Sequence, residues 1–211
     1  MPHYDLDRGI ARENLSRLLS ACYYEPGPEF AEEKVFDSML EAATRIHPEL
    51  AAHAQPLGEA YTAAGHDALL LDYTRLFLGP NQIIAKPYGS VWLEGENTVM
   101  GESTMAVQKL YEEGGFDMRE EFHEVPDHIA VELEFLYLLI FRENEAQRNG
   151  ELEVRRGKTV LRKRFLDEHL GCWIGSFTSA VMAGAQSSYY RGLAELTVGF
   201  VDLEAGKVRT S

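Results

Sequence analysis

The side chains best suited to binding or chemistry gather in two short stretches, residues 88–92 (YGSVW) and residues 124–128 (EVPDH). The first pairs two aromatics on a segment rich in glycine and proline, and the second places an acid and an imidazole ahead of an apolar run. Between Ser90 and Glu134 the chain has twelve carboxylates against two cations. This setting favours a basic peptide as the ligand over a nucleic acid or a metabolite.

Each of these side chains has two interpretations. Asp127 is placed either to accept a bidentate hydrogen bond from an arginine or only to cap a helix, and His128 would respond to pH near its ordinary range. Tyr88 and Trp92 either receive the apolar part of a peptide or plug the core. Glu132, four residues after His128, is interpreted as an exposed or locally paired carboxylate.

An enzyme is the rival interpretation. His123, Glu124, Asp127 and His128 are all metal-ligand residue types, and a helical metal-dependent enzyme would use them together. Pro126 interrupts the helical register, however, and the spacing differs from that of the zincin motifs. We therefore expect no metal and no catalytic residues.

Two basic features are interpreted as structural. Residues 157–159 (GKT) match the end of a P-loop, but Leu152 stands where the first glycine belongs and no strand precedes it. The basic stretch from Arg155 to Arg164 is interpreted as a solvated helix face, with an acidic partner surface or an anionic cofactor as alternative contacts.

The bulk properties exclude several classes of protein. At 211 residues with a net charge of -14 and a pI near 4.9, the chain suits one domain and disfavours nucleic-acid binding. Cys22 and Cys172 have no metal spacing and are interpreted as buried thiols in a reducing cytosol. Neither a signal peptide nor an apolar run of about 20 residues is present, so we expect a cytoplasmic protein without stable membrane insertion.

The elements that must position these residues are helices. Apolar spacing and breaker residues predict helices over residues 7–24, 30–46, 50–64, 67–77, 103–115, 126–147, 158–169, 173–185 and 187–201, with a loop from 81 to 102. No run of alternating apolar residues calls for a sheet. The expected fold is all-α, a single-domain helical bundle over residues 1–203 followed by a flexible tail, 204–211.

Three motifs in order resemble the TorD/DmsD family of redox-enzyme maturation chaperones, with NarJ as a more distant relative. They are residues 73–80 (YTRLFLGP), residues 87–92 (PYGSVW) and the EVPDH stretch; Asn81 and Gln82 depart from the closest pattern, where an aromatic stands. The resemblance implies an all-helical chaperone without catalysis or a cofactor of its own. It also implies these peptide-binding residues: Tyr88, Ser90, Trp92, Gly101, Glu124, Pro126, Asp127 and His128.

The resemblance further implies the partners. Such a chaperone binds the twin-arginine leader and the apo form of a molybdopterin oxidoreductase, and assists cofactor insertion and maturation before export. It leaves room for weak binding of a guanine nucleotide, and it implies no nucleic acid. The particular molybdoenzyme and the choice between monomer and domain-swapped dimer are left open.

Overall fold

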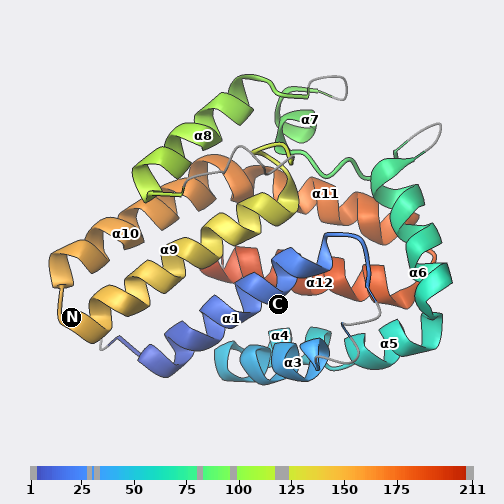
Figure 1. Cartoon of the computed structure of the whole chain (residues 1–211), viewed down its shortest axis with the longest axis horizontal. Helices are drawn as coiled ribbons and strands as arrows, with labels where there is room; N and C mark the ends of the chain where they lie inside the picture. The colour runs from blue at the N-terminus through green and yellow to red at the C-terminus, as the bar shows by residue number, and fades with distance from the viewer. Residues whose placement is uncertain are drawn as a thin grey trace.

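Helices make up almost all of the regular structure. The computed structural model describes residues 4–27, 30, 34–79, 83–95, 99–116 and 124–207, and in these ranges the only β feature is one isolated bridge. The elements are α1 (Leu6–Cys22), α3 (Val35–Ile46), α4 (Pro48–Ala54), α5 (Leu57–Ala64), α6 (His66–Tyr73), η1 (Thr74–Leu78), α7 (Gly89–Glu94), α8 (Glu102–Gly114), α9 (Ile129–Asn149), α10 (Leu152–Phe165), η2 (Leu166–Leu170), α11 (Gly171–Gly184) and α12 (Ser188–Glu204) (Figure 1). The all-α expectation is confirmed.

The apolar run after residue 128 forms α9, which packs against α1 on one side and α10 on the other (Figure 1). The first half of α9 is buried over most of its circumference, as expected of a central helix. Two small residues of α1 tie the helices together: the hydroxyls of Ser16 and Ser20 donate to the carbonyl oxygens of Leu133 and Ala130 at 2.9 and 2.8 Å. Helix α1 therefore fixes the position of the start of α9.

Two helix boundaries differ from expectation for local reasons. The first helix is capped by Asp5 rather than Asp7, because the Asp5 carboxylate accepts a hydrogen bond from the Arg8 amide. The single helix expected over residues 50–64 is two helices, α4 and α5. Pro56 separates them, since it has no N–H and its ring obstructs a continuous helix.

Two further segments were misjudged from the sequence. The expected loop from 81 to 102 contains the short helix α7. The helix expected to start at Lys158 begins at Leu152, because the intervening Arg155 and Arg156 are good helix formers. The first change matters for the site, since α7 carries part of it.

The YTRLFLGP motif forms the end of α6 and the π-helical segment η1. Asp72, buried just before the motif, accepts a hydrogen bond from Arg75 at 2.8 Å and from the amides of Gln186 and Ser187 at 3.0 and 2.8 Å. It thereby joins α6 to the start of α12. The arginine of this motif is thus part of a structural anchor, and Pro80 lies outside the described residues.

A buried ionic network joins four helices. Glu204 at the end of α12 accepts hydrogen bonds from Arg12 Nε and Nη2 at 2.5 and 2.6 Å and from Arg162 Nη1 at 2.7 Å. Arg162 Nε also donates to Glu143 of α9 at 2.8 Å. Burial alone would raise the pKa of Glu204, but the two arginines hold it below its usual value.

The end of the chain is described as far as Lys207. Glu204 belongs to the ionic network, and Lys207 Nζ donates to the carbonyl of Gly171 at 2.6 Å. Residues 208–211 of the expected tail lie outside the described residues. Among the helices in the described ranges, none combines the length and the hydropathy that a membrane span requires.

Candidate peptide-binding site

The two chemistry-bearing stretches lie side by side. Tyr88 and His128 form an antiparallel bridge, in which the Gly89 amide donates to the carbonyl of Asp127 and the Ile129 amide donates to the carbonyl of Pro87, both at 2.8 Å. This pairing, which we call the clamp, joins residues 87–90 to residues 127–129. The start of α7 and the start of α9 are therefore held together.

The carboxylate of Asp127 stabilises the clamp. Its side chain is fully buried, and Oδ2 accepts a hydrogen bond from the Ser90 amide at 2.7 Å. Its Oδ1 and the buried hydroxyl of Ser90 have no hydrogen-bond partner among the described residues. The carboxylate therefore anchors the first turn of α7. In this structure it does not present itself to an incoming arginine, which the bidentate interpretation required.

His128 is the N-cap of α9. Its Nδ1 accepts a hydrogen bond from the Ala130 amide at 3.2 Å, which places the proton of the neutral ring on Nε2. Burial lowers the pKa of His128 to about 4, against a smaller opposing effect of Asp127. The imidazole is therefore neutral near pH 7. Two tyrosines pack against the imidazole ring: Tyr24 stacks on it with the ring centroids 6.1 Å apart, and Tyr88 meets it edge-on at 5.5 Å.

The aromatics of the first stretch are only partly buried. Trp92 packs against the core, meeting Phe177 at 6.3 Å, and its Nε1 donates to the carbonyl of Lys86 at 2.8 Å. Tyr88 is half-buried over His128. Both side chains combine a fixed position with a solvent-facing part, which is the requirement for an anchor of a bound peptide.

Below the clamp lies a buried polar group that sequence reasoning misjudged. Glu132 is fully buried, not exposed; its Oε1 lies 2.8 Å from His169 Nε2 and its Oε2 accepts from Trp173 Nε1 at 3.2 Å. Burial raises the pKa of Glu132. Burial alone would lower the pKa of His169, but the nearby Glu132 raises it overall, so the pair retains a proton between its facing atoms.

The side chains of this polar group lie close to Gly89, the first residue of α7. A Cβ atom on Gly89 would lie 3.0 Å from Trp173 Nε1 and 3.1 Å from Glu132 Oε1. A larger residue would press on both side chains, so glycine suits the close approach of the start of α7 to α9 and α11. The signal in the sequence was the glycine itself, but its partners are far away in the chain.

Gly101 and Pro126 connect the site to α8. The Glu94 carboxylate caps α8 by accepting from the amides of Glu102 and Ser103 at 3.2 and 2.7 Å, and a Cβ on Gly101 would collide with it. Pro126 is not in the first turn of α9, which begins at Ile129. Its carbonyl instead accepts a hydrogen bond from the Tyr111 hydroxyl at 2.7 Å.

Beside the clamp lies a group of residues that includes some that the sequence analysis missed; in it Tyr24 and Tyr88 are half-buried and Tyr73 is buried. Tyr24, Tyr73 and Tyr88 lie in the electric field of nearby carboxylates. Burial, then Glu134 and Glu124, raise the pKa of Tyr24 to about 12; burial, then Glu124 and Glu25, raise the pKa of Tyr73 to about 12. We call these six residues the tyrosine–carboxylate rim: Tyr24, Tyr73, Tyr88, Glu25, Glu124 and Glu134. Tyr24 and Tyr73 come from distant helices, so no local signal could have placed them here.

The acidic excess is smaller at the surface than in the sequence. Asp127 and Glu132 are buried, Glu94 caps α8, and Glu113 is paired with Arg164. Four more of the twelve carboxylates lie outside the described residues: Glu96, Asp117, Glu120 and Glu121. The rim, through Glu124 and Glu134, retains two of the remainder in partly exposed positions.

Comparison with known proteins identifies the family. The model of the nitrate reductase delta subunit family matches residues 37–179, which is more than half of the chain and contains the whole clamp. The chain belongs to this family. Among curated proteins it is 31% identical over 139 residues to the chaperone protein TorD of Photobacterium profundum, and 26% identical over 182 residues to the Tat proofreading chaperone DmsD of Salmonella typhimurium. The expected TorD/DmsD relationship is confirmed.

The share of each chain that is matched differs between the relatives. The DmsD match includes 86% of this chain and 82% of that protein. The TorD match includes 65% of this chain and spans 62% of the TorD length, as does a 27% identical match to TorD of Vibrio parahaemolyticus.

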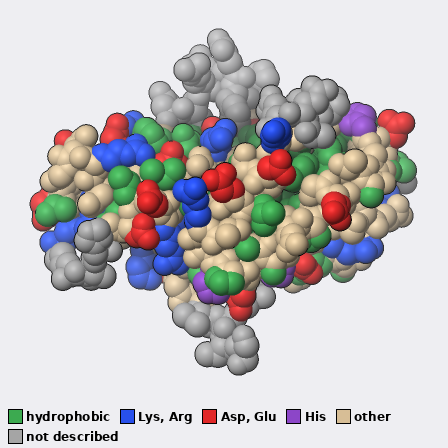
Figure 2. Space-filling view, turned by 90° about the horizontal axis from the view of Figure 1, so that it is seen from below, with side chains coloured by type: hydrophobic (Ala, Val, Ile, Leu, Met, Phe, Trp, Pro, Cys, Tyr) green, Lys and Arg blue, Asp and Glu red, His purple; other side chains and the backbone are tan. Residues whose placement is uncertain are grey.

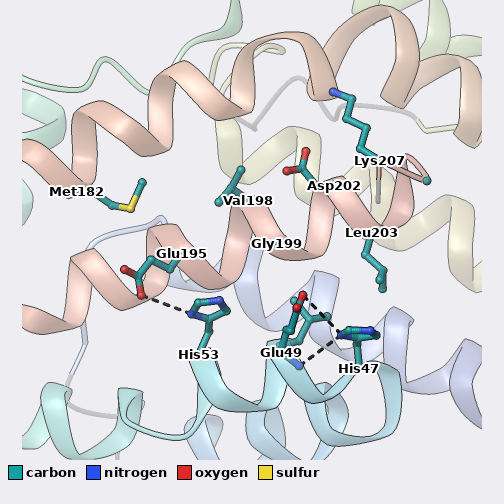
Figure 3. A pocket seen from close by; sticks show the side chains of 12 residues that line it. His47, Glu49, His53, Met182, Glu195, Val198, Gly199, Asp202, Leu203 and Lys207 are labelled. Atoms are coloured by element: carbon teal, nitrogen blue, oxygen red, sulfur yellow. Dashed lines mark hydrogen bonds and ion pairs between the residues drawn. The ribbon is translucent and has the colours of Figure 1, made fainter. Parts of the chain in front are cut away.

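The residues of the rival metal-centre interpretation are not grouped as metal ligands in the part of the chain that the structure describes. Within the described ranges no three His, Cys, Asp or Glu side chains are grouped to hold a metal ion, and His123 lies outside those ranges. Asp127 and His128 already accept backbone hydrogen bonds through Oδ2 and Nδ1. A separate cavity of about 510 Å³ between α4 and α12 holds His53, 3.5 Å from Glu195, but none of the predicted site residues (Figure 3).

Proposed function

We propose that this protein is a cytoplasmic redox-enzyme maturation chaperone without catalytic activity. Its client is a molybdopterin oxidoreductase, whose twin-arginine leader and apo form it binds while the cofactor is inserted and before export. The names of the relatives, TorD and Tat proofreading chaperone DmsD, support this class of function. The observation that carries it is the clamp, which holds two aromatic anchors beside the carboxylates of the rim.

The site residues divide into two groups in this proposal. Ser90, Asp127 and His128 hold the backbone of the clamp through buried hydrogen bonds, and Pro126 is tied to α8 through its carbonyl. The tyrosine–carboxylate rim receives the leader arginines, since guanidinium groups pair with carboxylates and stack on aromatic rings. Glu124 thus keeps its predicted role as a direct contact.

The apolar part of the leader needs a surface beside the rim. Trp92 offers one, and the chain that follows it, in α7, in α8 and in the segment between them, carries exposed apolar side chains: Leu93, Val99, Met100 and Met105. Flexible methionine side chains adapt to peptides of varied sequence. The aromatic and apolar surface gives affinity, and the carboxylates of the rim select for arginine.

Calorimetry with a synthetic twin-arginine leader tests the proposal. We expect saturable binding that weakens with salt, and weaker binding of the same peptide with both arginines replaced by glutamine. The double variant Glu124→Gln/Glu134→Gln should bind the leader about tenfold or more weakly, which corresponds to roughly 1.4 kcal/mol. The exposed Glu112→Gln serves as the matched control.

The two peptides make the result decisive. Equal affinity for the arginine and glutamine peptides would remove arginine recognition from the site. Stoichiometric metal in the purified protein, with no leader binding, would favour the rival helical metal-dependent enzyme that uses His123, Glu124, Asp127 and His128.

A further inference from the structure

A second pocket, of about 380 Å³, lies at the end of the bundle where α1 begins, and none of the candidate peptide-binding residues lines it. Four arginines line it from two helices: Arg8 and Arg12 of α1, and Arg155 and Arg162 of α10. In an acidic protein such a concentration of guanidinium groups is unusual. On the face drawn in Figure 2, Lys and Arg side chains gather toward this end of the molecule.

Two of these arginines are already neutralised. Arg12 and Arg162 form the ionic network with Glu204 and Glu143, in which two cations meet two carboxylates. The lowered pKa of Glu204 means that its charge is kept at neutral pH. The network forms a rigid floor for the pocket, because each of its members is tied to a different helix.

The other two arginines form no ion pair in this network, although Arg8 adds to the field that lowers the pKa of Glu204. The side chain of Arg8 is exposed and has neither a hydrogen bond nor an ion pair with any described residue. The guanidinium of Arg155 lies over the ring of Tyr4 at 5.0 Å, and its buried Nε has no acceptor among the described residues. A ring contact therefore positions Arg155, while its hydrogen-bonding capacity is unused.

The start of α1 also lines the pocket. The pocket is lined by Asp5 and Gly9 at the start of α1, where the helix dipole is positive. Asp5 is the only other carboxylate in the described lining besides Glu204, and it is engaged in capping the Arg8 amide. Two guanidiniums outside the ionic network, beside a helix N-terminus, are an arrangement that binds phosphate groups.

We propose that this pocket binds a phosphate group through Arg8 and Arg155, with the ring of Tyr4 and the side chain of Leu203 as an apolar wall for the organic part of a phosphate ester. The volume of the pocket exceeds what a lone phosphate ion needs, so an ester is favoured over free phosphate. The proposal is independent of leader binding, because it uses no residue of the clamp or the rim.

Calorimetry in phosphate-free buffer tests the pocket with three probes: orthophosphate, pyrophosphate and phenyl phosphate, with benzoate as a monoanionic comparison. We expect saturable binding of phenyl phosphate, with benzoate at least tenfold weaker. Arg155→Gln and Arg8→Gln should each weaken phenyl phosphate about tenfold or more, the loss of one charge-assisted contact. Arg148→Gln, which removes an exposed arginine near the end of α9, is the matched control and should bind normally.

The outcomes distinguish an ester ligand from free phosphate, and they distinguish the pocket from the leader-binding site. Phenyl phosphate tighter than orthophosphate indicates an ester ligand, and equal affinities indicate free phosphate; both support the pocket. No saturable binding of any probe, or binding that neither Arg155→Gln nor Arg8→Gln weakens, would overturn it. Thermal melting should show that both variants fold, since neither arginine belongs to the ionic network, and their affinity for the leader peptide should not change.

Discussion

Asp127 and His128 are neighbours in the chain with separate structural tasks. Asp127 anchors α7 through the Ser90 amide, and His128 caps α9 through the Ala130 amide. Both tasks need an acceptor atom rather than a positive charge or an exposed acid. Acid and imidazole side chains at the start of a helix are therefore compatible with a binding site in which neither touches the ligand directly.

Asp127→Ala should lower the free energy of unfolding by about 1–3 kcal/mol, because the Ser90 amide would be left buried without an acceptor. Asp127→Asn keeps an acceptor oxygen of the same shape and should recover most of that loss. Chemical denaturation measures both variants. If Asp127→Asn kept full stability yet lost most of its leader affinity, the carboxylate would have to contact the leader arginine after all.

The neutral state of His128 gives a pH dependence of stability. Its pKa is lowered to about 4 in the folded protein and is near 6.5 when unfolded, so the unfolded chain binds the extra proton first. Stability from this group is complete above about pH 6.5 and is lost as the pH falls toward 4. NMR titration of the His128 ring should show no protonation at pH 6; a midpoint near 6.5 would contradict the burial argument.

The short helix α7 is the element on which the site depends. It is held at its start by the clamp and rests on the polar group formed by Glu132, His169 and Trp173. Three helices, α7, α9 and α11, with η2 between α10 and α11, must all be in place before the aromatics of residues 88–92 are positioned. The binding surface is thus a property of the packed elements rather than of the loop sequence.

Gly89→Ala tests this close packing. The added methyl would press on Trp173 and Glu132, and we expect a loss of about 1–3 kcal/mol of stability together with weaker leader binding. Gly175→Ala in α11 is the control, because a Cβ there meets no atom within 4 Å. That change should be neutral or stabilising by up to about 1 kcal/mol. Equal effects of the two changes in thermal melting would show that α7 is not tightly packed.

At the scale of the whole molecule, the ionic network holds the helix bundle together at the end opposite the start of α9. Arg12, Glu143, Arg162 and Glu204 come from α1, α9, α10 and α12, so one buried cluster links the first helix to the last. Removing one member leaves an unbalanced buried charge, which costs more than the pair itself contributes.

Glu204→Gln should therefore destabilise the protein by about 3–5 kcal/mol, as expected when one partner of a buried ion pair is removed. The exposed pair of Glu153 and Arg156 supplies the comparison, and Glu153→Gln should change stability by less than about 1 kcal/mol. Urea denaturation of both variants measures the difference. A loss below about 1 kcal/mol for Glu204→Gln would mean that the network is solvated in solution.

The sequence by itself determined the helical class, the central helix and the two stretches that form the clamp. These follow from local rules, since apolar periodicity and caps depend on residues within a few positions of each other. It also indicated the family through three motifs between residues 73 and 128, all of which lie in the matched range.

Only the tertiary structure decided which of the acidic residues face solvent. Glu132 was predicted to be exposed or locally paired; it is buried because His169 and Trp173, more than thirty positions away, supply its partners. Tyr24 and Tyr73 join the rim because α1 and α6 end beside His128 and Glu124. Burial and charge pairing depend on contacts between distant segments, and a single sequence carries no measure of those distances.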